Sequence, residues 1–257
     1  MMSGFSSVRS AVYVTGMALV LLLSALVAPS SAAEVRVAVA SNFTQTLSKI
    51  AAHYQKQSGH SVSTIPGSSG RLYSQICNGA PFDVFLAADS LRPTALETAG
   101  LCVPGTRFTY ALGSLVLWTA DASNPNVKAA LLSNPDQRIA IANPQLAPYG
   151  HAAFEVLTSI DLWDQVSPHL VRGENVAQTF QFVHSGNATM GFVSQAQVLR
   201  LPVSNKGAIW LTPKNLYSPI KQQAVLLRDT AAARGLLHFL TSTEALRILQ
   251  ADGYDTP

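Results

Sequence analysis

The 257-residue sequence has few charged side chains and no block of one sign. Lys, Arg, Asp and Glu together make up 12% of the residues, and the formal net charge is only +3 at pH 7. Proteins that bind nucleic acid or a membrane surface concentrate Lys and Arg in runs or on one face, whereas here the basic residues are scattered. We therefore expect no nucleic-acid partner and no membrane-surface partner.

Cysteines and metal-ligand patterns are also scarce. Cys77 and Cys102 are the only cysteines, and such a pair permits a disulfide in an oxidising compartment without requiring one. The six histidines form no i, i+4 pair and have no cysteine at ligand spacing, so the sequence predicts no metal site of its own. The acidic residues are spread out and no Ser/His/acid spacing can be read, so we expect no enzymatic activity.

Long apolar runs are missing except at the N-terminus. Arg9 is the only charged residue before Glu34, and the apolar run Ala11–Val27 is followed by small residues up to Ala33. This order is typical of a cleaved export signal, and an uncleaved anchor is the alternative because the run is near the lower limit for spanning a bilayer. We predict a signal peptide over residues 1–33 and a free periplasmic product.

Strand-like and helical segments alternate after the predicted signal. The predicted strands are Val35–Ala40, Ser61–Ile65, Asp83–Ala87, Ser114–Thr119, Arg138–Ala142, Met190–Val193, Ala208–Leu211 and Gln223–Leu227. The predicted helices are Thr44–Gln57, Arg71–Asn78, Leu91–Ala99, Gly150–Ser159, Val176–Ser185 and Thr230–Leu240. A βαβα order of this kind predicts an α/β protein with mostly parallel sheets and helices on both faces.

Two stretches, residues 109–114 and 212–219, indicate crossings between two lobes, because each leads into an apolar strand without a flexible linker. A chain that crosses twice makes one lobe discontinuous. We predict lobe 1 over residues 34–112 and 214–257, and lobe 2 over residues 113–213. A cleft between two such lobes is where ligands bind in open α/β sheets, at the carboxyl ends of the strands.

Two loops at strand ends in the first lobe suggest an anion site. Ser41-Asn42 follows the first predicted strand, and Gly67-Ser68-Ser69-Gly70 follows the second. Each precedes a helix, whose N-terminus offers unpaired N–H groups and the positive end of the helix dipole. Each motif also has a structural alternative, because Ser and Asn are preferred N-caps and Gly-Ser loops are common turns.

Two helix starts in the second lobe could face the same cleft. Tyr149-Gly150 ends a Pro-rich loop and could present backbone N–H groups and a phenol, although a buried structural tyrosine is the alternative. Asn175 could cap the next helix while Val176 offers its backbone N–H, although this pair could equally be an ordinary helix start.

At these residues the chain resembles the periplasmic molybdate-binding proteins of ABC transporters. The most specific part of the resemblance is Asn78–Asp89, with the pattern Asn-Gly-Ala-Pro-x-Asp-Val-Phe…Ala-Asp. The other matching segments are Val37–Thr44, Gly67–Gly70, Gly113–Trp118, Ala142–Gly150, Gly191–Val193 and Gly253–Tyr254. The resemblance implies a two-lobed periplasmic binding protein of type II. In that fold each lobe is a mixed, mostly parallel sheet flanked by helices, and two hinge crossings join the lobes.

The resemblance also implies a ligand and a ligand shell. One molybdate or tungstate dianion is expected between the lobes, held by Ser41, Asn42, Ser69, Tyr149 and Val176. Molybdenum then enters only as the bound oxyanion, so no cofactor is expected. The implied protein is a monomer that delivers its ligand to an inner-membrane ABC permease. Many relatives have a serine in place of Asn42, an alanine in place of Tyr149 and a tyrosine in place of Ser194, so the sequence leaves the role of Ser194 open.

The chemistry of this shell agrees with a fully ionised ligand. The shell contains neutral donors and no carboxylate, whereas a protonated phosphate would benefit from an acceptor. Molybdate, tungstate and sulfate are therefore favoured over phosphate, and another tetrahedral oxyanion such as sulfate is the alternative ligand. A remote alternative is a periplasmic serine hydrolase with Ser69 as the nucleophile, which would need a histidine and an acid from elsewhere in the chain.

Overall fold

The computed structural model describes residues 32–123 and 125–256. The predicted signal peptide therefore lies almost entirely outside the described residues. Within these ranges no helix is both long enough and apolar enough to cross a membrane. Residues 33–257 form one structural unit, which contains two sheets.

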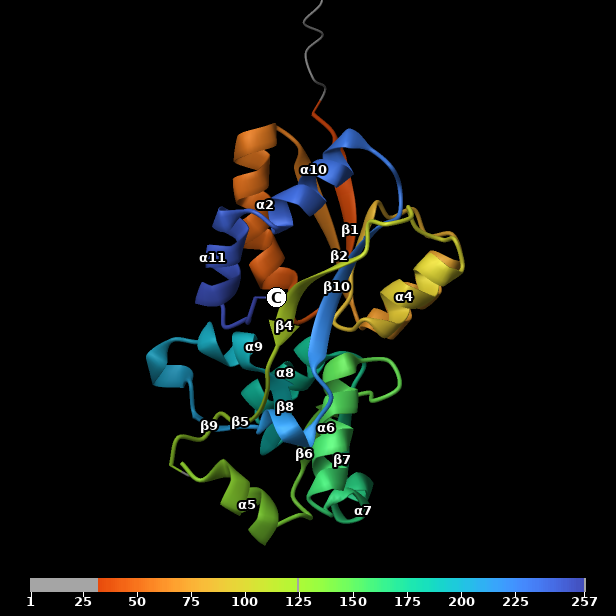
Figure 1. Ribbon diagram of the computed structural model, residues 1–257. Helices are drawn as coiled ribbons and strands as arrows, with labels where there is room; N and C mark the ends of the chain where they lie inside the picture. Colours follow the sequence, from red (N-terminus) through yellow and green to blue (C-terminus); the bar gives the residue numbers. More distant parts are fainter. Residues whose placement is uncertain (1–31, 124, 257) are drawn as a thin grey trace, which may run out of the picture. The chain divides into compact units, whose positions relative to one another are not determined.

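The first sheet gathers strands from both ends of this unit and has the order β2-β1-β3-β10-β4. These strands are Ser61–Gly67, Glu34–Ala40, Val84–Leu86, Ile220–Leu226 and Phe108–Gly113. β10 runs opposite to the other four strands. The helices of this part, which we call lobe 1, are α2 (Thr44–Ser58), α3 (Ser69–Cys77), α4 (Leu91–Thr98), α10 (Ala231–Leu240) and α11 (Thr243–Ala251) (Figure 1).

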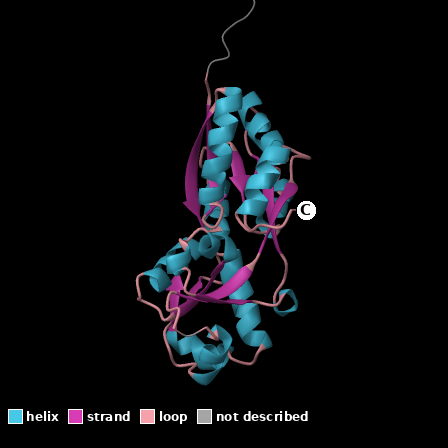
Figure 2. Ribbon diagram, turned by 90° about the vertical axis from the view of Figure 1, so that its left-hand side faces the viewer, coloured by secondary structure: helices cyan, strands magenta, loops and turns pink. Residues whose placement is uncertain are grey.

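The second sheet has the order β7-β6-β8-β5-β9. Its strands are Leu170–Gly173, Ile139–Ala142, Met190–Ser194, Leu115–Thr119 and Ala208–Leu211, and β5 runs opposite to the other four. The helices of this part, which we call lobe 2, are α5 (Val127–Ser133), α6 (Pro148–Ser159), α7 (Trp163–Val166), α8 (Val176–His184) and α9 (Gln195–Leu199). Helices flank the strands of both lobes (Figure 2).

The two sheets share one plan. In each, the reversed strand is the one that arrives from the other sheet. β4 ends at Gly113 and β5 begins at Leu115, so the first crossing needs a single residue. The chain returns between Leu211, the end of β9, and Ile220, the start of β10. The predicted fold is thus confirmed: mixed, mostly parallel sheets with flanking helices and two crossings.

The apolar runs of the central strands are explained by burial on both faces of a sheet. In β1, alternate residues enter different cores, because successive side chains of a strand point to opposite faces. Val35, Val37 and Val39 belong to the cluster that α2, α10 and α11 cover. Ala38 belongs to a separate cluster with Leu72 of α3.

Each predicted strand and helix overlaps an observed element, but several observed elements were not predicted. All of β4 except Phe108 lies in the stretch expected only as a crossing, and β7, α5, α7, α9 and α11 were missed. α11 carries a readable signal, since Ala245 and Leu249, four residues apart, are both buried. The short elements carry little periodicity, which is why pattern alone does not find them.

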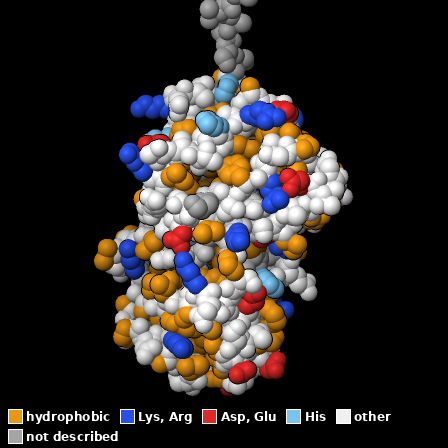
Figure 3. Space-filling view, viewed as in Figure 1, with side chains coloured by type: hydrophobic (Ala, Val, Ile, Leu, Met, Phe, Trp, Pro, Cys, Tyr) orange, Lys and Arg blue, Asp and Glu red, His pale blue; other side chains and the backbone are white. Residues whose placement is uncertain are grey.

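The two thiols and the surface charges complete the description. Cys77 is exposed, Cys102 is buried, and the structure has both as free cysteines. On the face shown in Figure 3, basic and acidic side chains are interspersed. This arrangement gives that face no broad field of one sign.

Candidate functional site

A small cavity lies where the two lobes meet, and four helices begin at it or beside it. Its lining comes from the loops after β1, β2, β3 and β6 and from the starts of α3, α6 and α8: Ala40, Ser41, Asn42, Gly67, Ser68, Ser69, Ala88, Ala147, Pro148, Tyr149, Asn175 and Val176. The cavity has a volume of only about 10 Å³ in this arrangement, about enough for one water molecule. All five predicted site residues line this cavity.

Local sequence explains why the helices start here. Asn175 caps α8, since its Oδ1 accepts hydrogen bonds from the N–H groups of Ala177 (3.0 Å) and Gln178 (3.1 Å). Pro148 occupies the first turn of α6, where its fixed φ and missing N–H suit a helix start. Each start brings the positive end of a helix dipole to the cavity.

Backbone donors at the cavity are left free. Among the lining residues, the N–H groups without a hydrogen-bond partner in the described part of the chain are those of Asn42, Ser68, Ser69, Tyr149, Asn175 and Val176. Three of these residues belong to lobe 1 and three to lobe 2. N–H groups at helix starts lack an intrahelical acceptor, and an anion is the partner that both the N–H groups and the dipoles favour.

The two serines of the Gly-Ser-Ser-Gly loop are used differently. Ser69 is fully buried, and its Oγ accepts a hydrogen bond from the Ala88 N–H (2.9 Å), which leaves its own proton free to donate. Ser68 is 4% exposed and its Oγ has no partner. The sequence prediction named Ser69 alone, although the adjacent serine in the same motif was the available signal for Ser68.

Ser41 and Asn42 do not act as caps of α2, which has no side-chain cap. Ser41 Oγ lies 3.4 Å from the Ala177 N–H of lobe 2. The Asn42 amide is committed elsewhere, because its Nδ2 donates to Gln222 Oε1 (2.9 Å) and to the Tyr254 hydroxyl (3.2 Å). Both hydrogen bonds engage the Asn42 amide nitrogen within the protein, so its backbone N–H is the donor left for a ligand.

Tyr149 is buried at the crossing between the lobes. Ser194 Oγ donates to the Tyr149 phenolic oxygen (3.2 Å), and a Cβ at Gly113 would lie only 2.2 Å from that oxygen. Burial raises the pKa of the Tyr149 phenol well above its usual value, so the phenol keeps its proton. Ser194 does not line the cavity. Its hydroxyl contacts Tyr149, and the residue also caps α9 in a capping box with Gln197.

The lining contains no charged side chain and no histidine. Ser69 therefore has no general base beside it, and the geometry gives the hydrolase alternative no support. Across residues 32–123 and 125–256, no group of three or more His, Cys, Asp or Glu side chains could hold a metal ion. What the cavity offers is a set of neutral hydrogen-bond donors.

Two larger grooves flank the cavity, with volumes of about 760 and 860 Å³. One shares Ala88 and Pro148 with the cavity, and the other shares Ser41 and Asn175. Both are open and carry charged side chains. We place the site in the small cavity because the free donors converge there.

Direct contacts hold the lobes together around the cavity. The Gly70 N–H donates to the Leu146 carbonyl (2.8 Å), and Arg92 Nη2 donates to the Gln145 carbonyl (2.8 Å). An ion pair between Arg71 and Glu174 (2.7 Å) also crosses between the lobes, but both side chains are more than half exposed. Such exposed pairs contribute little to stability, so the two backbone carbonyl contacts are the more specific ones.

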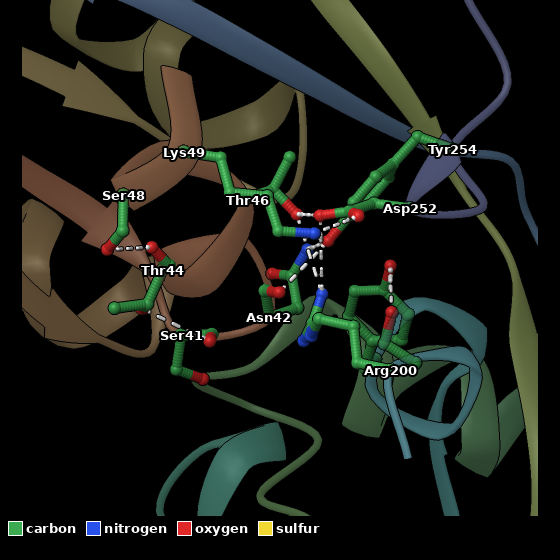
Figure 4. A network of polar contacts seen from close by, with 11 residues as sticks. Ser41, Asn42, Thr44, Thr46, Ser48, Lys49, Arg200, Asp252 and Tyr254 are labelled. Atoms are coloured by element: carbon green, nitrogen blue, oxygen red, sulfur yellow. Dashed lines mark hydrogen bonds and ion pairs between the residues drawn. The ribbon is translucent and has the colours of Figure 1, made fainter. Parts of the chain in front are cut away.

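A buried carboxylate extends these contacts on the side of α2 and α11 (Figure 4). Asp252 is 3% exposed and accepts hydrogen bonds from Thr46 Oγ1 (2.7 Å) and Lys49 Nζ. From lobe 2, Arg200 Nη1 lies 4.0 Å from Asp252 and 3.5 Å from Thr46 Oγ1. The network links α2, the end of α11 and the end of α9, so it spans both lobes.

Comparison with known proteins places this geometry in a family. Residues 35–255 match the family described as bacterial extracellular solute-binding protein. The chain is 44% identical over 238 residues to the molybdate-binding protein ModA of Rhodobacter capsulatus, covering 91% of this chain and 93% of that protein. It is 45% identical over 233 residues to ModA of Azotobacter vinelandii, covering 89% and 92%.

A solved structure agrees with both the fold and the sequence matches. The periplasmic molybdate-binding protein of Azotobacter vinelandii superposes with a TM-score of 0.82 at 40% sequence identity. The superposition covers 87% of this chain and 99% of that chain. The similarity therefore extends over both lobes and the cavity between them.

Proposed function

The chain belongs to the bacterial extracellular solute-binding proteins, and we propose that it captures molybdate or tungstate between its lobes and delivers the anion to an ABC permease. The observation that carries this proposal is the convergence of free neutral donors from both lobes on one small cavity. The names of the relatives at 44–45% identity point to the same ligand.

The donor set favours a fully ionised tetrahedral dianion. Backbone N–H groups and serine hydroxyls can all donate hydrogen bonds to its oxygens. The lining contains no carboxylate that could accept a hydrogen bond from a protonated ligand. The helix dipoles supply positive potential without a Lys or Arg side chain. Sulfate shares the charge and shape of molybdate, so the size of the cavity is what we expect to separate the two.

Lobe closure is the conformational change that we expect on ligand binding. Donors from both lobes reach one anion only when the lobes are together, so the anion stabilises the closed arrangement more than an open one. In the described part of the chain the backbone crosses between the lobes twice, and both cysteines lie in lobe 1, so no disulfide opposes a hinge motion. We propose that a permease recognises the closed, loaded form.

The remaining parts of the proposal follow from the family and the sequence. The protein is exported through a signal peptide over residues 1–33, cleaved after Ala33, and acts in the periplasm as a monomer. It carries no cofactor and no enzymatic activity. Its molybdenum is bound only as the transported oxyanion.

A thermal-unfolding scan of the cleaved protein tests the proposal. The protein, shown to be ligand-free, is scanned with molybdate, tungstate, sulfate or phosphate at equal concentration. A ligand at a hundredfold excess over its Kd adds about 2.7 kcal/mol to the free energy of unfolding, which raises Tm by roughly 5–10 °C at this size. We expect this rise with molybdate and tungstate only. A rise with sulfate as well would show that the selectivity is wrong, and no rise with any anion would refute the oxyanion site.

Closure itself is tested at Gly70, whose backbone N–H donates to the Leu146 carbonyl of lobe 2. A Cβ at this position would lie 3.0 Å from the Leu146 carbonyl oxygen and 3.3 Å from Arg92 Nη2. Gly70→Ala is therefore expected to weaken molybdate binding by about 1 kcal/mol, roughly fivefold in Kd. The Tm of the ligand-free protein is expected to stay the same or rise, because alanine has a higher helix propensity than glycine. Calorimetric titration measures the Kd, and affinity equal to that of the unmodified protein would show that the lobes need not approach this closely.

A further inference from the structure

One polar atom at the cavity has no partner in the protein. Ser68 Oγ is buried and makes no hydrogen bond, although the residue is only 4% exposed. A buried hydroxyl without a hydrogen-bond partner has lost its contacts with water and gained none in return. Because Ser68 lines the cavity, a ligand in the cavity can supply the partner that the described chain lacks.

The usual structural role of a serine at this position is also missing. Ser68 is the N-cap residue of α3, with extended backbone angles (φ −75°, ψ 147°). An N-cap serine normally accepts a hydrogen bond from the N–H two or three residues later. Ser68 makes no such bond, so its hydroxyl is neither a cap nor part of another hydrogen-bond pair within the described chain.

The neighbouring serine shows the contrast. Ser69 Oγ accepts from the Ala88 N–H (2.9 Å) and so holds the loop after β3 against α3. Ser68 and Ser69 both line the cavity, but only Ser69 has a structural hydrogen bond. The loop therefore has two hydroxyls at the cavity. That of Ser69 is hydrogen-bonded within the protein, and that of Ser68 is not.

We infer that Ser68 Oγ–H donates a hydrogen bond directly to the bound oxyanion, as a ligand-binding residue additional to Ser41, Asn42, Ser69, Tyr149 and Val176. This inference rests on the proposed function, because it needs an anion in the cavity. The bound oxyanion supplies the acceptor that the protein lacks. The unpaired hydroxyl thus costs stability in the ligand-free closed form and is satisfied on binding.

The test is Ser68→Ala, with Kd for molybdate and ligand-free Tm measured side by side. Loss of a hydrogen bond to a charged group is expected to raise Kd by about 10- to 100-fold. Ligand-free Tm is expected to stay unchanged or rise, because the variant removes an unpaired hydroxyl and no protein hydrogen bond. Ser68→Cys keeps a side chain of similar shape with a weak donor, and we expect it to raise Kd as well.

Ser74→Ala is the matched control. Ser74 lies on α3, its Oγ donates to the Gly70 carbonyl (3.1 Å), and it does not line the cavity. We expect its Kd to stay within about twofold of the unmodified protein.

The outcomes separate this inference from the proposed function. If the unmodified protein binds molybdate and Ser68→Ala binds it equally well, the inference is overturned and the proposed function stands. A lower ligand-free Tm with unchanged Kd would assign Ser68 a structural role instead. An unaffected Kd in Ser68→Cys beside a weakened Ser68→Ala would show that binding does not need a hydroxyl donor at this position, which would overturn the inference. No binding by the unmodified protein would overturn both.

Discussion

Gly150→Ala is expected to cost about 3 kcal/mol or more of stability and to abolish molybdate binding. A Cβ at Gly150 would lie 2.2 Å from the Ala142 carbonyl oxygen, 2.6 Å from the Ala142 carbonyl carbon and 2.9 Å from the carbonyl carbon of Asn143. All three are backbone atoms, so no side-chain rotation relieves the clash. α6 would have to move off the end of β6, and the free N–H of Tyr149 would move with it.

The measurement is a thermal scan together with a calorimetric titration of molybdate. A loss of about 3 kcal/mol corresponds to a fall in Tm of roughly 6–12 °C for a protein of this size. His151→Ala is the control, because His151 follows Gly150 on α6 but is exposed and does not line the cavity. Tm and Kd near those of the unmodified protein in Gly150→Ala would show that α6 does not need its close approach to β6.

Ser69→Ala is expected to have the second largest effect, because it removes two interactions at once. The loss of a hydrogen bond to the charged ligand should weaken molybdate binding by about 1.5–3 kcal/mol, roughly 10- to 150-fold in Kd. The Ala88 N–H, which now donates to Ser69 Oγ, would be left buried without an acceptor. This unpaired N–H should lower the free energy of unfolding of the ligand-free protein by about 1–3 kcal/mol.

Affinity and stability together distinguish Ser69→Ala from Ser68→Ala, because only Ser69→Ala is expected to lose both. Calorimetry reports the loss of affinity, and denaturant unfolding of the ligand-free protein reports the loss of stability. Ser74→Ala serves again as the control on the same helix. Unchanged affinity in Ser69→Ala would remove Ser69 from the ligand shell, whatever happens to stability.

Much of the fold could be predicted because its signals are local. β1 and β6 are short apolar runs, and α2 and α8 follow cap or turn residues, so strand ends and helix starts could be located within a few residues. α11 was missed although Ala245 and Leu249 carry a helical spacing, and β4 was missed because its residues were interpreted only as a crossing. Missing these elements did not change the predicted fold, because the alternation of the longer strands and helices determines that fold.

The members of the candidate site were also predictable, but their use was not. Within each lobe the predicted residues come together because the carboxyl ends of parallel strands and the helix starts that follow them meet at one edge of the sheet. The edges of the two sheets then contribute to the same cavity. Which atoms remain free depends on partners far away in sequence. The Asn42 side chain is taken by Gln222 and Tyr254, 180 and 212 residues away.

The sequence by itself determined the α/β class, the two crossings, the helix starts that carry the donors and, through resemblance, the expected oxyanion. These depend on periodicity, capping residues and motif identity, which act over a few neighbouring residues. Only the tertiary structure decided that Ser69 is tied to Ala88 while Ser68 is free, and that Tyr149 packs against Gly113 and Ser194. Long-range packing determines which donor and acceptor pair with each other. A buried donor that remains unpaired therefore cannot be recognised from its neighbours in the sequence.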